Sequence, residues 1–204
     1  MEIKDGGILI IAGPRTGSTN LMKSIGSAYN KKINFEPNIL KKSTTYNSET
    51  DVVKYVPLPI QWKDFQKNIN NSSFDLTENL EYFKEYDLLL NSVTKFNTVI
   101  LLNRLNKLEQ MESFYALRTY NKKVSDSWNT EVYIDYESHY YKFVKEFILR
   151  TDFIIHRLSC DLNIPINYYE DVYKTKCLIN NDIKLDLEYL DSKYKLRKSD
   201  KNII

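Results

Sequence analysis

The chain has 204 residues, which is enough for one domain with a buried core that needs no disulfide. Hydrophobic residues make up 42% and charged residues 27% of the sequence, as in an ordinary globular protein. The formal net charge of +2 is too small to predict a nucleic-acid-binding surface. We therefore expect a single domain over residues 1–204, with no nucleic acid among its partners and with any anion site formed by local cations.

Cysteine usage and hydropathy narrow the class of protein further. Cys160 and Cys177 are not arranged as CxxC and have no nearby histidine pair. The sequence thus predicts neither a metal site nor a disulfide framework, but two reduced, mostly buried thiols. No run of about 18 apolar residues occurs, and the N-terminus lacks the basic and long apolar regions of a signal peptide. We expect no membrane span and a cytoplasmic protein.

The first predicted elements are a strand, a loop and a helix. The apolar run Ile8–Ala12 predicts a buried strand, Gly13–Thr19 forms a polar loop, and Leu21, Met22 and Ile25 indicate an amphipathic helix. Backbone N–H groups and hydroxyls in such a loop can bind a phosphate, whose negative charge the helix dipole favours. The sequence therefore predicts a phosphate-binding loop directly after the first strand.

Strands and helices alternate along the rest of the chain. The expected elements are a polar connection over 30–51, a strand over 52–56, helices over 61–69 and 77–90, a strand over 98–102, helices over 107–120 and 138–158, a strand over 164–168, and a mostly helical segment over 170–191. This order predicts a three-layer α/β fold, with helices on both faces of a mostly parallel sheet. Ligands of such sheets bind beyond the carboxyl ends of the strands, where both the 13–19 loop and Arg104 are expected.

The loop departs from two common nucleotide-binding patterns. The Walker pattern G-x-x-x-x-G-K-[ST] needs a lysine after its second glycine, whereas Ser18 follows Gly17 here and the cation Arg15 precedes it. The dinucleotide pattern G-x-G-x-x-G is also missing. Residues 14–21, Pro-Arg-Thr-Gly-Ser-Thr-Asn-Leu, instead resemble the 5′-phosphosulfate loop of sulfotransferases.

A second stretch, residues 99–113, is similar to the 3′-phosphate motif of the same family. There a strand-terminal Arg and a Ser on the next helix bind the 3′-phosphate of 3′-phosphoadenosine 5′-phosphosulfate (PAPS), and Arg104 and Ser113 stand at those positions. A guanidinium can make a bidentate, charge-assisted contact with a phosphate. The Asn-Lys-Leu-x-Gln-x-x-Ser wording of residues 106–113 resembles the bacterial nodulation-factor and trehalose sulfotransferases in particular. Residues 169–172, Tyr-Glu-Asp-Val, are a third similarity, whose acids can cap a helix N-terminus.

The resemblance implies a sulfotransferase fold of P-loop-like type and a PAPS-dependent reaction. A sulfuryl group would pass from PAPS to a hydroxyl of a carbohydrate or small metabolite, leave adenosine 3′,5′-bisphosphate (PAP) as product, and need no metal. By the same resemblance Arg15 acts beside the bridging oxygen, and the cofactor is bound by Arg15, Thr16, Gly17, Ser18, Thr19, Asn20, Arg104 and Ser113. The basic residues Arg197 and Lys198 are similar to the family's closing loop, although the usual Gly-Asp-Trp ending is missing and a frayed tail is the alternative.

The general base is predicted with alternatives. Lys54–Pro57 resembles the family's Lys-Thr-His-x-Pro run but lacks its histidine, and His139 and His156 fall in helical sequence where packing or surface roles are expected. Glu36 stands where the bacterial group has its catalytic Glu and can take the acceptor's proton if it lies within hydrogen-bond reach; otherwise it is a solvated loop residue. Lys54 is a second catalytic candidate facing the sulfuryl oxygens, or simply a residue of the strand.

Two other functions stay open beside the sulfotransferase. A small P-loop kinase is disfavoured by the missing Walker lysine and by the lack of an evident Mg²⁺ aspartate after a strand. A degenerate fold could bind nucleotide or a partner without catalysis. The acceptor pocket is expected over residues 37–50, 57–80 and 120–140. Aromatic residues there either stack on a sugar ring or belong to the core, namely Trp128, Tyr133, Tyr136, Tyr140 and Tyr141.

Overall fold

The structure, a computed structural model, describes residues 3–35, 37, 39, 45–57, 81–119 and 133–173. The expected helix over 61–69, the first residues of the helix expected over 77–90 and most of the helical segment over 170–191 lie outside these residues. Cys177 and Trp128 lie outside them as well. All structural statements below concern the described part of the chain.

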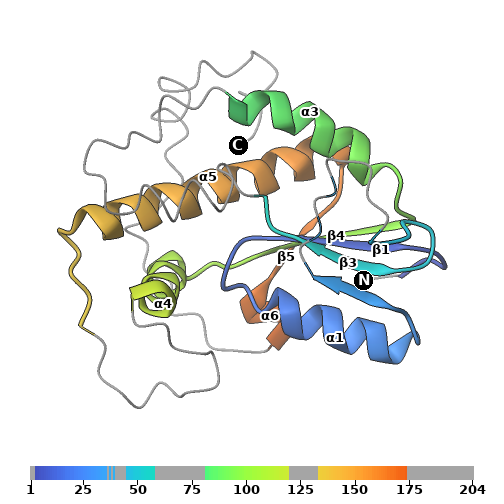
Figure 1. The fold of residues 1–204 in the computed structure, drawn as a ribbon, viewed down its shortest axis with the longest axis horizontal. Coiled ribbons are helices and arrows are strands. Elements are labelled where there is room, and N and C mark those ends of the chain that lie inside the picture. Colours follow the sequence, from blue (N-terminus) through green and yellow to red (C-terminus); the bar gives the residue numbers. More distant parts are fainter. Residues whose placement is uncertain are drawn as a thin grey trace.

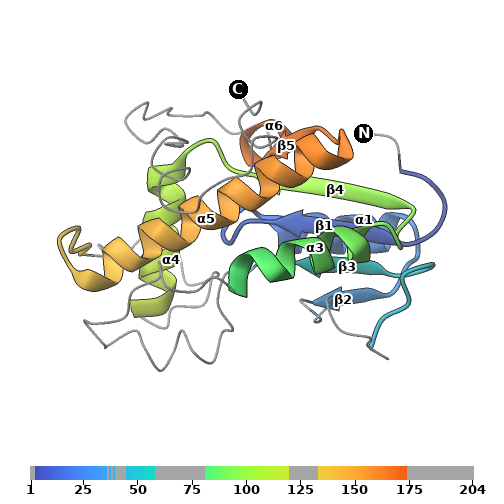
Figure 2. The same cartoon turned by 90° about the horizontal axis from the view of Figure 1, so that it is seen from above.

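The centre of the fold is an all-parallel sheet of five strands. Its strands are β1 (Ile8–Ala12), β2 (Ile33–Phe35), β3 (Val52–Tyr55), β4 (Thr98–Asn103) and β5 (Ile166–Tyr168). They lie side by side in the order β2-β3-β1-β4-β5, which Figure 2 shows from above. The expected α/β fold with a parallel sheet is thereby confirmed at this coarser level.

Helices cover both faces of the sheet, so that helices, sheet and helices form three layers (Figure 1). One face carries α1 (Ser18–Ala28) and α6 (Tyr169–Tyr173), and the other carries α3 (Glu81–Val93) and α5 (His139–Leu162). The helix α4 (Lys107–Thr119) follows the carboxyl end of β4 and lies beyond the sheet, where it packs on α5. No helix in this part of the chain is both long enough and apolar enough to cross a bilayer.

The apolar side chains of the central strands alternate between the two faces, as the pleat requires. Leu9, Ile11 and Leu101 belong to the core under α3 and α5, whereas Ile8 and Ile10 pack toward Met22 and Ile25 of α1. All residues of β1 are fully buried, which fits the continuous apolar run of a strand covered on both sides. The predicted strands at the centre of the sheet are therefore present.

The structure differs from the predicted elements at β2, β5 and α5 for local reasons, and α3 ends at Val93 rather than at residue 90. β2 was expected to be part of a polar connection, but Ile33 pairs with Val52 at the sheet edge and thereby becomes a strand. β5 starts at Ile166 rather than at residue 164, because Ile164 N donates to Ser159 O at the end of α5 and Pro165 has no N–H for a ladder. α5 extends to Leu162, where Asn163 adopts a left-handed conformation (φ 52°) and ends it.

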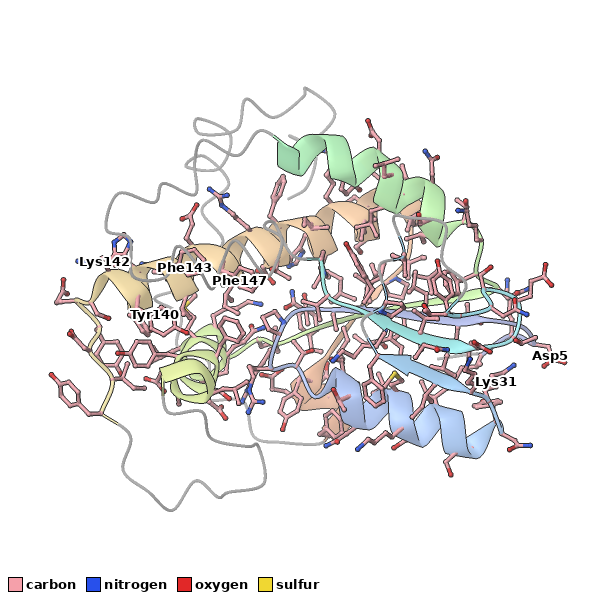
Figure 3. All side chains as sticks on the ribbon, in the orientation of Figure 1. Asp5, Lys31, Tyr140, Lys142, Phe143 and Phe147 are labelled. Atoms are coloured by element: carbon pink, nitrogen blue, oxygen red, sulfur yellow. The ribbon has the colours of Figure 1, made fainter. Side chains whose placement is uncertain are left out.

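A separate apolar cluster joins α4 to α5. Figure 3 shows Phe143 and Phe147 on the side of α5 that is directed at α4, and the Phe147 ring stacks on Phe114 at a centroid distance of 5.3 Å. Of the aromatic residues with two predicted roles, Tyr141 is buried in this cluster and Tyr140 is half-buried, whereas Tyr133 and Tyr136 are exposed. The expectation of a buried thiol was wrong for Cys160, which is exposed near the end of α5.

Candidate functional site

The candidate site lies at the carboxyl end of β1, where the connections of the sheet change direction. β1 pairs with β3 on one side and with β4 on the other, and the chain crosses over β1 between those two strands. In an open parallel sheet, this switch point is where a ligand crevice forms. The 13–19 loop, predicted to bind phosphate, leaves β1 at that point.

Two left-handed residues shape this loop. Arg15 has φ 60° and Gly17 has φ 72°, and Thr16 between them is fully buried and donates its hydroxyl to Gly13 O at 2.8 Å. A β-carbon on Gly17 would come within 3.0 Å of the Tyr169 and Tyr173 rings, so both the φ and the space require glycine. Tyr173 also donates its hydroxyl to Gly17 O at 2.8 Å, which fixes α6 against the loop.

The N-terminus of α1 faces the same place without a side-chain cap. Gly17 is the N-cap and has no side chain to cap the terminus, and the first turn contains no acidic residue. The first N–H groups of any helix have no acceptor within the helix, and the helix dipole makes this end attract anions. Ser18 and Thr19 supply hydroxyls at the first two positions of the helix. This arrangement can bind a phosphate or a sulfate group.

Arg15 links the loop to α4, which lies far away in the sequence. Its Nε donates to Ser113 Oγ at 2.7 Å. Among the described residues Arg15 forms no ion pair, although it lies close enough to Arg104 for the two charges to repel each other. Burial and, secondarily, the Arg104 charge lower the pKa of Arg15, so the folded protein holds a cation here that an added anion would stabilise.

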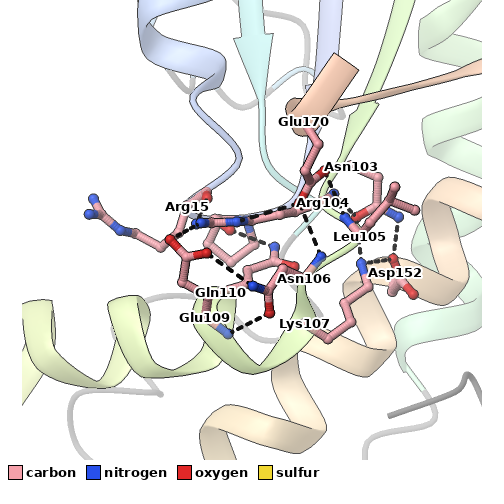
Figure 4. A network of polar contacts seen from close by, with 11 residues as sticks. Arg15, Asn103, Arg104, Leu105, Asn106, Lys107, Glu109, Gln110, Asp152 and Glu170 are labelled. Carbon is pink, nitrogen blue, oxygen red and sulfur yellow. Dashed lines mark hydrogen bonds and ion pairs between the residues drawn. The ribbon is translucent and has the colours of Figure 1, made fainter. Parts of the chain in front are cut away.

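Arg104, at the end of β4, is buried and its guanidinium is surrounded by partners (Figure 4). Its Nη1 donates to Arg15 O at 3.2 Å, its Nη2 pairs with Glu109, and its Nε lies 3.9 Å from Glu170 Oε1. The guanidinium also stacks over the Tyr169 ring, with Cζ 4.7 Å from the ring centroid. Arg104 thus connects three segments and holds the backbone of Arg15 in place.

Glu170 caps the segment that leads into α4. Its two carboxylate oxygens accept from Leu105 N and Asn106 N, each at 3.0 Å. This matches the expectation that an acid of the 169–172 motif caps a helix N-terminus, although the helix is α4 rather than its own. Asn106 and Glu109 complete this start: Asn106 Oδ1 accepts from Glu109 N at 3.2 Å, and its amide donates to Glu109 Oε2 at 3.1 Å.

Lys54 lies at the end of β3, on the other side of β1. Its side chain is buried, and its Nζ donates to Thr19 Oγ1 at 3.0 Å. The structure therefore brings a second predicted cation to the first turn of α1. The alternative, that Lys54 is only a residue of the strand, does not account for its hydrogen bond to Thr19.

A buried ion pair supports the site from the α5 side. Lys107 Nζ donates to Asp152 Oδ1 at 2.6 Å and to Asn103 Oδ1 at 2.8 Å, and the Asn103 amide also donates to Asp152. Burial lowers the pKa of Lys107, while the Asp152 carboxylate opposes that shift. This cluster joins β4, α4 and α5 beside Arg104 (Figure 4).

The predicted site residues divide into two groups. Arg15, Thr16, Gly17, Ser18, Thr19, Lys54, Arg104 and Ser113 all lie around the carboxyl ends of β1, β3 and β4. Asn20 is on the same turn of α1 but exposed. The candidate base Glu36 and the basic residues Arg197 and Lys198 lie outside the described residues.

Sequence reasoning missed Glu109, Gln110 and Asp152 as neighbours of the site. Gln110 is buried and donates its amide to Pro14 O at 2.7 Å, which ties α4 to the loop. Glu109 had a usable signal, because Asn-x-x-Glu at the start of a helix is a capping pattern. Asp152 had no such signal in the sequence, since it stands in the middle of a long helix.

Comparisons with protein-family models, with curated proteins and with solved structures give no match for this chain.

Proposed function

We propose that this protein is a PAPS-dependent sulfotransferase that transfers a sulfuryl group to a hydroxyl of a carbohydrate or small metabolite. The observation that carries the proposal is the hydrogen bond from Arg15 Nε to Ser113 Oγ. These residues come from the two separate motifs that resemble the family's 5′-phosphosulfate and 3′-phosphate motifs. A nucleotide that carries phosphate groups at both its 5′ and 3′ positions needs two anion sites that lie no further apart than these groups. The hydrogen bond between Arg15 and Ser113 joins the two segments that are candidates for these sites.

The roles follow from the charges and donors at the loop. The N-terminus of α1, with Ser18 and Thr19, would bind the 5′-phosphate through N–H groups and hydroxyls. Arg15, which has no ion pair among the described residues, would stabilise charge on the leaving phosphate. Lys54, held beside Thr19, would face the sulfuryl oxygens. Arg104 and Ser113 would bind the 3′-phosphate, and Arg197 and Lys198 would close over the cofactor.

Binding of the product nucleotide tests the ligand class. We expect calorimetric titration to give tighter binding for PAP than for ATP. Ser113→Ala should weaken PAP binding about tenfold to a hundredfold, the effect of one hydrogen bond to a charged group. The matched control is Ser24→Ala, which removes an exposed hydroxyl from α1 and should leave the affinity unchanged. No PAP binding, or equal affinity for ATP, would contradict the proposal.

Transfer of labelled sulfate from PAPS to a panel of hydroxyl acceptors tests the reaction itself. In the reaction the acceptor oxygen bonds to sulfur, the bond from sulfur to the bridging phosphate oxygen breaks, PAP leaves, and the proton goes to the base. Glu36→Gln should abolish turnover of an identified acceptor while PAP binding persists. Undiminished turnover in this variant would exclude Glu36 as the base.

A nucleotide-binding protein without catalysis is the second candidate. Its support is the missing histidine of the run that Lys54–Pro57 resembles, since that histidine serves as the base in many members of the family. PAP binding with no transfer to any acceptor would favour this function over the enzyme. The small kinase remains the third candidate, and preferential binding of ATP would favour it.

A further inference from the structure

The contact between Glu109 and Arg104 occupies part of the guanidinium that the proposed function assigns to a phosphate. Arg104 Nη1 is bound to Arg15 O, Nη2 to Glu109, and Nε faces Glu170. A phosphate that approaches Arg104 therefore meets a carboxylate already in place. Because like charges at this range repel, the two anions cannot both bind Nη2 favourably.

The two carboxylates around Arg104 differ in how firmly they are held. The Glu170 side chain is only 6% exposed and accepts two backbone N–H groups, so moving it would leave buried donors without acceptors. The Glu109 side chain is 43% exposed, and among the described residues its only other side-chain contact is the Asn106 amide at 3.1 Å. Glu109 can therefore turn into solvent once another anion takes its place on the buried Arg104 Nη2, whereas Glu170 stays.

We infer that Glu109 is a specificity-determining residue that competes with the 3′-phosphate of the nucleotide for Arg104. The inference rests on the proposed function, because it takes Arg104 as a phosphate ligand. Without nucleotide, Glu109 balances the Arg104 charge and keeps the guanidinium against the Arg15 carbonyl. With nucleotide, the phosphate replaces the carboxylate on Nη2 and Glu109 turns outward. Anions too weak to displace Glu109 are thereby rejected at this position.

The variant Glu109→Gln separates the charge of the side chain from its structural role. Glutamine keeps the length and can still accept from the Asn106 amide, and it fits the same helix-start pattern. It removes only the negative charge beside Arg104. The matched control is Glu112→Gln, one turn away on α4, which changes the net charge equally but removes a carboxylate that contacts Tyr136 rather than Arg104.

The ligand pair is PAP and adenosine 5′-monophosphate, which differ only in the 3′-phosphate. At one fixed, low salt concentration we expect Glu109→Gln to bind PAP about three- to tenfold more tightly than the wild type, the size of a partly exposed ion pair. Its affinity for adenosine 5′-monophosphate should not change, and Glu112→Gln should match the wild type for both ligands. Calorimetry measures all six affinities.

The possible outcomes distinguish the two claims. If the wild type binds PAP but Glu109→Gln binds it equally or more weakly, the inference fails and the proposed function stands. If Glu112→Gln tightens PAP binding as much, or if the monophosphate gains as much as PAP, the effect is general electrostatics and the inference fails. If neither the wild type nor Glu109→Gln binds PAP, the proposed function fails and the inference with it.

Discussion

The two sides of the carboxyl edge hold their cations in opposite ways. On the β1 side, Arg15 is half-buried and has no ion pair among the described residues, and its only side-chain hydrogen bond there is to a serine. On the β4 side, Arg104 and Lys107 are each paired with carboxylates, from Glu109 and Glu170 in one case and Asp152 in the other. Among the described residues, the cations of the β4 side thus have carboxylates beside them, and Arg15 has none.

We expect the β4 side mainly to hold the fold together and the β1 side mainly to bind the ligand. The β4 side is neutralised internally, and its ion pairs connect β4, α4, α5 and α6 into a frame. Among the described residues, the β1 side holds a cation without a carboxylate partner, beside a helix N-terminus whose N-cap is a glycine. An incoming anion is therefore expected first at the loop after β1, and at Arg104 only after Glu109 moves.

The largest effect is expected where the frame is broken. Asp152→Ala should lower the free energy of unfolding by about 3–5 kcal/mol, because it leaves the buried Lys107 ammonium without its carboxylate. Urea denaturation measures the change. The control is Glu137→Ala, which removes the exposed pair with Lys142 and should have little effect. Similar stabilities for the two variants would contradict the structural role of the β4 side.

On the β1 side, a substitution should weaken ligand binding and change the stability little. Arg15→Ala should weaken PAP binding about tenfold to a hundredfold, because a charged hydrogen-bond donor to the ligand is lost. Its unfolding midpoint should stay near that of the wild type, since Arg15 has no ion pair to lose among the described residues. Calorimetry and urea denaturation on the same protein test both parts. A destabilised variant with unchanged PAP affinity would reverse the roles assigned to the two sides.

A smaller effect is expected from the loop glycine. Gly17→Ala should lower the free energy of unfolding by about 1–2 kcal/mol, the cost of a left-handed residue with a side chain. The new methyl group would also push against Tyr169 and Tyr173 and move α6. Ser27→Ala, an exposed change on α1, is the control and should be neutral in urea denaturation. Equal stability of the two variants would mean that the loop does not need its left-handed residue.

The smallest effect concerns pH. Burial lowers the pKa of His156 below its usual value of 6.5, although the nearby Asp152 carboxylate opposes this shift. As the pH falls below about 6.5 the unfolded chain therefore binds a proton before the folded one does, and the stability decreases. His156→Gln should reduce this loss when urea midpoints are compared at about pH 7.5 and about pH 5.5. His139→Gln, at an exposed position, should keep the loss, and equal behaviour of the two variants would contradict the assignment.

Much of the sheet could be predicted from local sequence, because its central strands are continuous apolar runs. Ile8–Ala12 and the strand at Thr98 are buried on both faces, and such strands need no partner to be recognised. β2 could not be predicted in this way, since its three residues become a strand only by pairing with β3. The start of α5 was predictable, and Ser138 accepts from Tyr141 N as an N-cap should.

The site could be predicted only as separate motifs. The loop and the Arg104 segment were recognisable, but the hydrogen bond between Arg15 and Ser113 joins residues 98 positions apart. The same holds for Glu170, whose contacts with residues 105 and 106 depend on β5 lying beside β4. The pairing of carboxylates with cations depends on how the segments assemble at the carboxyl edge of the sheet. A local sequence pattern therefore cannot predict it.

We propose that the loop after β1 and the β4 side together form one nucleotide site. A crystal structure with adenosine 3′,5′-bisphosphate tests it most directly. The 5′-phosphate is expected at the N-terminus of α1, beside Ser18 and Thr19, and the 3′-phosphate at Arg104 and Ser113 with Glu109 turned away. A nucleotide bound elsewhere, or bound at the loop while Glu109 still pairs with Arg104, would contradict it.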